Sequence, residues 1–236
     1  MPKNTTRLHD PLRDFRDSCG FALLANMDGE KSHWLVRTTL ESLSRLTHRG
    51  AVAADGKSGD GCGIMLQFPE PFLRDAAEDC GIKLSERFAS GLVFFSPDEV
   101  LIQRGQKILT RHLRRSALNV VGWREVPTNA EVVGEQAAAS MPVIYQVFVN
   151  APAGWRPHDI ERQLFAARRF AFEDQRKLND ADPLYYVVTL SCLNMVYKGL
   201  VQAEHLADFY PDLRDERMSS AIGICHQRFS TNTLPR

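Results

Sequence analysis

The pattern of apolar and polar residues changes at residue 19. Residues 1–18 are rich in charge and show no periodicity, whereas residues 19–27 are apolar and precede Asp28-Gly29, a dipeptide that favours a hairpin-type turn. We therefore predict a strand over 19–27 and treat residues 1–18 as a leader outside the folded part of the chain.

Apolar residues at helical spacing predict four longer helices. Val36, Leu40 and Leu43 recur at intervals of three and four residues, which predicts a helix that is capped by Ser32 and ends at about Leu46. The same reasoning predicts helices over residues 71–80, 98–116 and 158–178.

Short apolar runs predict the remaining strands. They cover residues 64–68, 91–95, 119–126, 143–149, 184–192, 193–200 and 221–229, and the glycine-rich segment 54–63 before the first of them is predicted to be a loop. The mixture of helices and strands predicts an α/β protein. Because the chain has no internal repeat and no low-complexity linker, we expect one domain.

Composition narrows the class of protein. Hydrophobic residues make up 44% of the 236 residues, which is enough for a sizeable core. Lys plus Arg and Asp plus Glu each number 29, so we expect neither nucleic acid nor an anionic membrane as a partner. Residues 1–18 contain no apolar run typical of a signal peptide, and no uncharged stretch is long enough to span a bilayer, which favours a cytoplasmic protein.

The five cysteines are odd in number and scattered, with no Cys-x-x-Cys pair. This spacing argues against a disulfide framework and against a zinc site, so we expect no metal in this chain. Most of these residues are expected to be ordinary buried thiols.

One segment partly resembles a phosphate-binding P-loop. Asp55-Gly-Lys-Ser58 matches the end of that motif, but the glycine required five positions before Gly56 is Ala51, and a helix is predicted where a strand should precede the loop. A glycine-rich turn is the favoured interpretation.

Cys19 stands at the boundary between the leader and the apolar strand. If the chain began at this residue, its free α-amine, with a reference pKa of about 7.7–8.0, could act as the general base for the thiol. This chemistry requires cleavage of the bond between Ser18 and Cys19. The alternative is a small core residue on an edge strand.

The last predicted strand runs into a polar cluster. Strand alternation places Ile222, Ile224, His226 and Arg228 on one face, so Arg228 would emerge at the end of an apolar surface. Its guanidinium could bind a substrate carboxylate, with Thr231 and its neighbours as neutral partners. A salt bridge at the strand end is the alternative.

Several motifs, in order along residues 19–236, resemble the glutaminase domain of glutamate synthases, of the bacterial NADPH type. Any one of them is weak, but together and in register they are specific. They are Leu46-Thr-His-Arg-Gly-Ala51, Ser58-Gly-Asp-Gly-Cys-Gly63, Val121-Gly-Trp-Arg-Glu-Val-Pro-Thr128, Asn150-Ala-Pro-Ala-Gly-Trp-Arg-Pro157, Val196-Tyr-Lys-Gly-Leu200, Phe209-Tyr-Pro-Asp212 and His226-Gln-Arg-Phe-Ser-Thr-Asn-Thr233.

The resemblance implies an N-terminal-nucleophile hydrolase, an αββα four-layer sandwich, with residues 1–18 as a propeptide and 19–236 as the N-terminal portion of a class-II amidotransferase domain. It implies that Cys19 is the nucleophile that hydrolyses L-glutamine, that Arg228 and Thr231 bind the substrate, and that Arg49 and Gly50 support the site.

The resemblance also implies a larger enzyme. Ammonia would pass to 2-oxoglutarate in a complete large chain that carries FMN and an iron–sulfur cluster. A small subunit with NADPH and FAD would supply electrons, and the resemblance implies no cofactor in the present chain itself. In the family, an Asn and a Gly donate the oxyanion hole and an Asp binds the amino group of the substrate. The later segments that carry these residues are absent from this sequence. We therefore expect a fragment, incomplete at the C-terminus and inactive alone.

Two other interpretations remain open. Another class-II amidotransferase would share the Cys-Gly start and His-Arg-Gly, but should lack the motifs at 196–200 and 226–233. A noncatalytic remnant or interaction domain would keep the fold and retain the leader.

Overall fold

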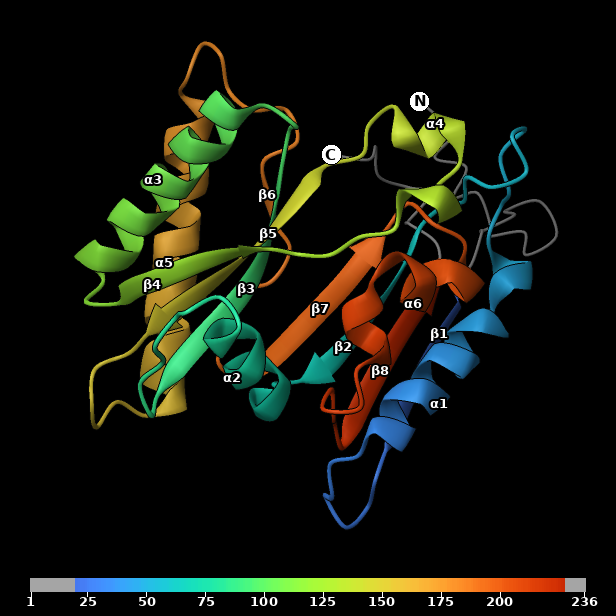
Figure 1. Ribbon diagram of the computed structural model, residues 1–236, viewed down its shortest axis with the longest axis horizontal. Helices are drawn as coiled ribbons and strands as arrows, with labels where there is room; N and C mark the ends of the chain where they lie inside the picture. Colours follow the sequence, from blue (N-terminus) through green and yellow to red (C-terminus); the bar gives the residue numbers. More distant parts are fainter. Residues whose placement is uncertain (1–19, 228–236) are drawn as a thin grey trace, which may run out of the picture.

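The computed structural model describes residues 20–227, whose eight strands form two four-stranded antiparallel sheets with helices packed beside them (Figure 1). The strands are β1 (Gly20–Ala25), β2 (Cys62–Gln67), β3 (Phe88–Phe95), β4 (Asn119–Glu125), β5 (Val143–Asn150), β6 (Tyr186–Val187), β7 (Asn194–Gly199) and β8 (Ile222–Gln227). The α-helices are α1 (His33–Ser44), α2 (Glu70–Glu78), α3 (Glu99–Arg115), α4 (Glu135–Ala138), α5 (Pro157–Arg176) and α6 (Leu206–Phe209). The 3₁₀ turns are η1 (Thr47–Arg49), η2 (Ala130–Val132), η3 (Ala203–His205) and η4 (Pro211–Arg214). The predicted mixture of helices and sheets is confirmed.

The first sheet has the strand order β1-β8-β2-β7. It therefore joins the first and last described strands, which are separated by almost the whole chain. Alternate residues of β8 and β2, such as Cys225 and Ile64, are buried on one face that we call the covered face. Ile222 and Met65 lie on the other, open face, and are 40% and 37% exposed.

Helix α1 lies against the covered face. Ser32 caps it as predicted, because its Oγ accepts a hydrogen bond from the Leu35 N–H at 3.3 Å. Thr39 is completely buried over β8, and a Cβ added at Gly223 would collide with its side chain. The glycine thus allows the helix to approach the strand closely.

The second sheet has the order β4-β5-β3-β6, and α3 and α5 pack together on one of its faces (Figure 1). The buried side of α3 includes Leu109 and Leu113, and that of α5 includes Leu164 and Ala167. Both helices begin and end within two residues of the predicted boundaries because a periodic apolar stripe defines them.

A shared core joins the two sheets. It contains Phe148 from β5, Leu73 from α2 and Tyr197 from β7, each with no exposed surface. At its edge, Arg124 of β4 donates two hydrogen bonds of 2.8 Å to the carboxylate of Asp212 in η4. This bidentate ion pair ties the second sheet to the short helices that cover the first.

One prediction about secondary structure was wrong, and two short helices were not predicted. Residues 184–192 form only the two-residue strand β6 and an isolated bridge between Ser191 and Ser90, because both Val188 N–H and Thr189 N–H donate to the Leu92 carbonyl. The short helices α4 and α6 were missed, since a single turn carries too few residues to show a period.

Candidate active site

The candidate site is built at the point where β1 begins and β8 ends. The two strands are antiparallel, and Gly20 lies directly opposite Gln227. Cys19 precedes Gly20 and Arg228 follows Gln227 in the sequence, so the two described residues that flank them are paired. Cys19, Arg228 and Thr231 themselves lie outside the described residues.

The other two predicted site residues lie against this strand pair. A Cβ added at Gly20 would be 3.1 Å from Arg49 Cγ. A Cβ added at Gly50 would collide with the Nε2 of Gln227. The structure therefore brings the Arg49-Gly50 turn onto Gly20, 30 positions before Gly50, and onto Gln227, 177 positions after it.

Local structure explains how this turn is formed. Residues Thr47–Arg49 make one 3₁₀ turn that begins two residues after α1 ends, and the Gly50 N–H donates to the Thr47 carbonyl at 3.0 Å. Gly50 then leaves in an extended conformation, with φ −99° and ψ 152°. Its need for glycine comes from the approach of Gln227 rather than from backbone strain.

Gln227 was not among the residues singled out from the sequence. Its side chain is 2% exposed, and its Oε1 has no hydrogen-bond partner among the described residues. A buried, unpartnered amide oxygen is costly, and in native proteins it usually has a structural or functional explanation. Gln227 lies against the Arg49-Gly50 turn and is paired with Gly20, the neighbour of Cys19. This position could have been recognised only from the fold.

A hollow of about 250 Å³ lies on the open face of the first sheet, between residues of β2, β7 and β8. Gly61 and Gly63 contribute little side-chain bulk to its wall, while Lys198 and His226 contribute polar atoms. Lys198 Nζ also lies 4.1 Å from the centre of the Tyr186 ring. His226 is the neighbour of Gln227, so the hollow adjoins the end of β8.

The glycine-rich loop is held by its own aspartate. Asp55 accepts hydrogen bonds from the backbone of Lys57, Ser58 and, at the start of α4, Gln136. A Cβ at Gly134 would collide with Ser58, so the loop packs tightly against α4. A carboxylate occupies the N–H groups to which a phosphate would have to bind, which supports the glycine-rich turn and not the P-loop.

These hydrogen bonds also change the acidity of Asp55. The bond from the Ser58 hydroxyl, followed by the backbone bonds from Ser58, Gln136 and Lys57, holds the pKa of the carboxyl well below its usual value. The loop is therefore held by an ionised group at neutral pH.

Three of the described cysteines are poor candidates for a nucleophile. Burial, and then the nearby Cys225, raise the pKa of Cys62 to about 12. Burial also raises the pKa of Cys225, and burial followed by a hydrogen bond with Glu161 raises that of Cys192 to about 12. At neutral pH these thiols are protonated and weakly nucleophilic.

Within residues 20–227, no group of three His, Cys, Asp or Glu side chains could hold a metal ion. No helix in that span is both long and apolar enough to cross a membrane.

Comparison with known proteins establishes the family. Residues 19–236 match the family described as glutamine amidotransferases class-II. The chain belongs to this family. The match begins at Cys19, the residue at which the hydrophobic pattern of the sequence changes.

Curated relatives of this amidotransferase domain are glutamate synthases. The chain is 36% identical to the ferredoxin-dependent glutamate synthase, chloroplastic, of Spinacia oleracea over 100% of its length and 15% of that protein. It is 36% identical to the glutamate synthase [NADPH] large chain of Bacillus subtilis (strain 168), over 93% of the chain and 14% of the relative. It is also 36% identical to the large chain of Azospirillum brasilense, over 98% of the chain and 15% of the relative.

The chain thus spans about 15% of the length of the relatives it matches. The prediction that it corresponds to the glutaminase part of a glutamate synthase large chain is confirmed. Relatives of the ferredoxin and NADPH types match equally well, so the comparison leaves the electron donor open.

Proposed function

We propose that this amidotransferase domain hydrolyses L-glutamine through a γ-glutamyl thioester on Cys19 and supplies the ammonia for glutamate synthesis. One observation carries the proposal: Gly20 and Gln227 are directly paired, and Arg49-Gly50 packs on both of them. Consecutive Cα atoms are about 3.8 Å apart, so covalent geometry alone keeps Cys19 and Arg228 near this pair.

The α-amine of Cys19 is the general base in this mechanism. It can accept the thiol proton only after residues 1–18 have been removed, because an amide nitrogen does not accept protons at neutral pH. The thiolate sulfur then bonds to the side-chain amide carbon of glutamine, and the carbonyl electrons move to oxygen. Collapse of this intermediate expels ammonia, which takes a proton from the ammonium group.

Water completes the reaction. The α-amine takes a proton from water, and the hydroxyl adds to the thioester carbon. The carbon–sulfur bond then breaks to release glutamate, and the ammonium group returns its proton to the sulfur, which regenerates the thiol. Each step needs only Cys19 and a stabilised oxyanion.

Arg228 is proposed to bind the α-carboxylate of glutamine. The continued alternation of β8 would put its side chain on the same face as His226, next to the hollow on the open face. Thr231 is proposed to help hold the substrate, through its side chain or its backbone. Arg49 and Gly50 play supporting roles, by fixing the ends of the two strands.

The fold is proposed to be an N-terminal-nucleophile αββα sandwich. Two antiparallel sheets with α1 on one and α3 and α5 on the other support this assignment. We propose that residues 1–18 are a propeptide, and that residues 19–236 are the N-terminal portion of the amidotransferase domain.

The complete enzyme is proposed to be cytoplasmic and to transfer the ammonia to 2-oxoglutarate. FMN and an iron–sulfur cluster would be held by the remainder of the large chain, while a small subunit with FAD would bring electrons from NADPH. The glutaminase steps above involve none of these groups.

The test is chemical labelling of the complete large chain purified from its host. A glutamine analogue with an electrophilic diazoketone should add one label, and peptide mass analysis should place it on a Cys19 that begins the chain. Arg228→Ala should slow labelling at low analogue concentration. A label on another cysteine, or full activity in a chain that retains residues 1–18, would refute the mechanism and favour a noncatalytic role for this site.

A further inference from the structure

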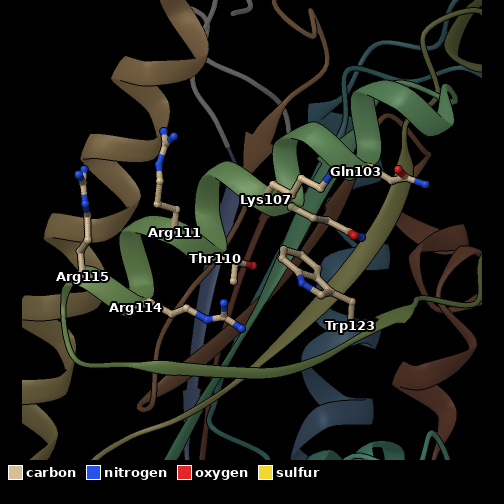
Figure 2. A pocket seen from close by; sticks show the side chains of 8 residues that line it. Gln103, Lys107, Thr110, Arg111, Arg114, Arg115 and Trp123 are labelled. Atoms are coloured by element: carbon tan, nitrogen blue, oxygen red, sulfur yellow. The ribbon is translucent and has the colours of Figure 1, made fainter.

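A shallow groove of about 680 Å³ lies beside α3, far from the candidate active site in the sequence and on the other sheet (Figure 2). Seven of its eight lining residues belong to α3, and the eighth is Trp123 of β4. Four of them are basic, namely Lys107, Arg111, Arg114 and Arg115, and the others are neutral. A groove with this lining has a strongly positive surface, although the whole chain has no net charge.

The charges of this groove are mostly uncompensated. Arg111 pairs with Asp174 of α5 at 2.7 Å, and Figure 2 shows it extending away from Trp123. No carboxylate of the described residues pairs with Lys107, Arg114 or Arg115. Exposed cations with no partner contribute little to stability but remain available for an anionic ligand.

The spacing of the charges indicates an extended ligand. Lys107 and Arg114 are seven residues apart, so they lie on the same side of α3, about 10 Å apart along its axis. Thr110 lies between them, and Trp123 lies opposite with part of its indole exposed (Figure 2). A ligand that contacts both cations along the helix axis therefore spans about 10 Å. A ligand with two negative groups that flank an apolar one would match the order of the lining.

The groove adjoins an open sheet edge. Among the described strands, β4 is paired on one side only, with β5. Its free edge presents unpaired backbone N–H and C=O groups, which can accept another strand. Because α3 packs beside β4, a strand added there would place alternate side chains under Lys107, Trp123 and Arg114.

We propose that this edge binds an acidic, extended segment of a partner protein as an additional strand beside β4. Two acidic residues four positions apart in a strand lie about 13 Å apart on one face, a span that the long side chains of Lys107 and Arg114 can match. An apolar residue midway between them would contact Trp123. A second copy of this chain is a poor occupant, because two such edges would bring like charges together.

The experiment uses the complete large chain and two fluorescein-labelled peptides. The first peptide contains the sequence glutamate-threonine-leucine-threonine-glutamate. In the second peptide, both glutamates are replaced by glutamine. We expect saturable binding of the acidic peptide by fluorescence anisotropy at low salt, with at least about tenfold weaker binding of the neutral one. Hydrogen exchange should slow in residues 119–125 when the acidic peptide is bound.

Charge reversal sharpens the test. The double variant Lys107→Glu, Arg114→Glu should bind the acidic peptide at least about tenfold more weakly, since both expected contacts become repulsive. Its matched control, Arg37→Glu with Arg162→Glu, has the same change in net charge on exposed residues of α1 and α5, and should bind like the unaltered chain. Circular dichroism would verify that both variants are folded.

Several results would overturn the proposal. Equal weakening in the two double variants would show that only net charge matters. Binding without slower exchange in β4 would exclude strand addition. Tighter binding of a random oligonucleotide than of the peptide would assign the groove to nucleic acid, and peptide-independent dimerisation through β4 would assign it to a second copy.

Discussion

The two sheets of this amidotransferase domain differ in how they are covered. In β3 of the second sheet, seven of eight residues are buried, whereas in β8 of the first sheet buried residues alternate with more exposed ones. Phe21 and Leu23, on the open face of the first sheet, are 72% and 62% exposed. The second sheet therefore carries more of the stabilising core, and the first sheet presents the residues that adjoin the candidate site.

This contrast separates stability from chemistry. A strand buried on both faces has little room for polar groups that do not hydrogen-bond internally. A strand buried on one face can place reactive groups on the other, while its covered face holds them in register. Substitutions in the two sheets should therefore affect different measurements.

The largest effect is expected at the start of β1. Cys19→Ala in the complete enzyme should remove glutamine-dependent glutamate synthesis, while synthesis from added ammonia continues, because ammonia bypasses the thioester. Steady-state rates with each nitrogen source measure the difference. If Cys62→Ala or Cys225→Ala produced this split instead, the assignment of the nucleophile would be wrong.

The end of β8 should show a smaller effect on activity. Arg228→Ala is expected to reduce kcat/KM for glutamine at least tenfold, since removal of one partner of a buried charge pair typically costs about 2–5 kcal/mol. The midpoint of urea unfolding should change much less. Unaltered kinetics would show that Arg228 does not bind the substrate and would favour a salt bridge at the strand end.

In the second sheet, substitutions should change stability more than activity. Phe148 has no exposed surface, so Phe148→Ala should lower the free energy of unfolding by about 3–5 kcal/mol. Leu23→Ala on the open face should change it by less than about 0.5 kcal/mol. Urea unfolding at 25 °C measures both, and equal losses would show that the open face is covered in solution.

The turn beside the site tests the fit between two segments. Gly50→Ala should cost about 1–3 kcal/mol, because the new methyl group collides with Gln227. Gly59→Ala is the control, since a Cβ there meets nothing closer than 3.5 Å. In a Gln227→Ala background the cost of Gly50→Ala should fall by at least about 0.5 kcal/mol. Additive effects would mean that the two residues are not in contact.

The smallest effect concerns the glycine-rich loop. Because the folded pKa of Asp55 is lowered from 3.8, its contribution to stability is fully present above about pH 4 and is lost as the pH falls below that value. Asp55→Asn should therefore lower the urea midpoint at pH 7, and this difference should shrink between pH 4 and pH 2. Asp28→Asn, in an exposed turn, is the control. A difference that is constant with pH would show that the ionised carboxylate does not hold the loop.

Sequence alone determined the long elements and the chemical hypothesis. Helices α1, α3 and α5 follow from apolar residues at three- and four-residue spacing, and the Ser32 cap follows from a side chain that accepts a local N–H group. The motifs predicted the amidotransferase family because several had to occur in one order. These signals are local in the sequence, so they can be recognised without knowledge of the structure.

Only the tertiary structure decided what surrounds the site. Gly50 and Gln227 are 177 positions apart, and no local pattern indicates that one must be small because the other is buried against it. The shortness of β6 and the existence of α4 also depend on distant partners, namely the Leu92 carbonyl and the Asp55 carboxylate. Contacts of this kind depend on close packing and hydrogen bonding between segments that are distant in the sequence. They are therefore determined only when the whole fold brings those segments together.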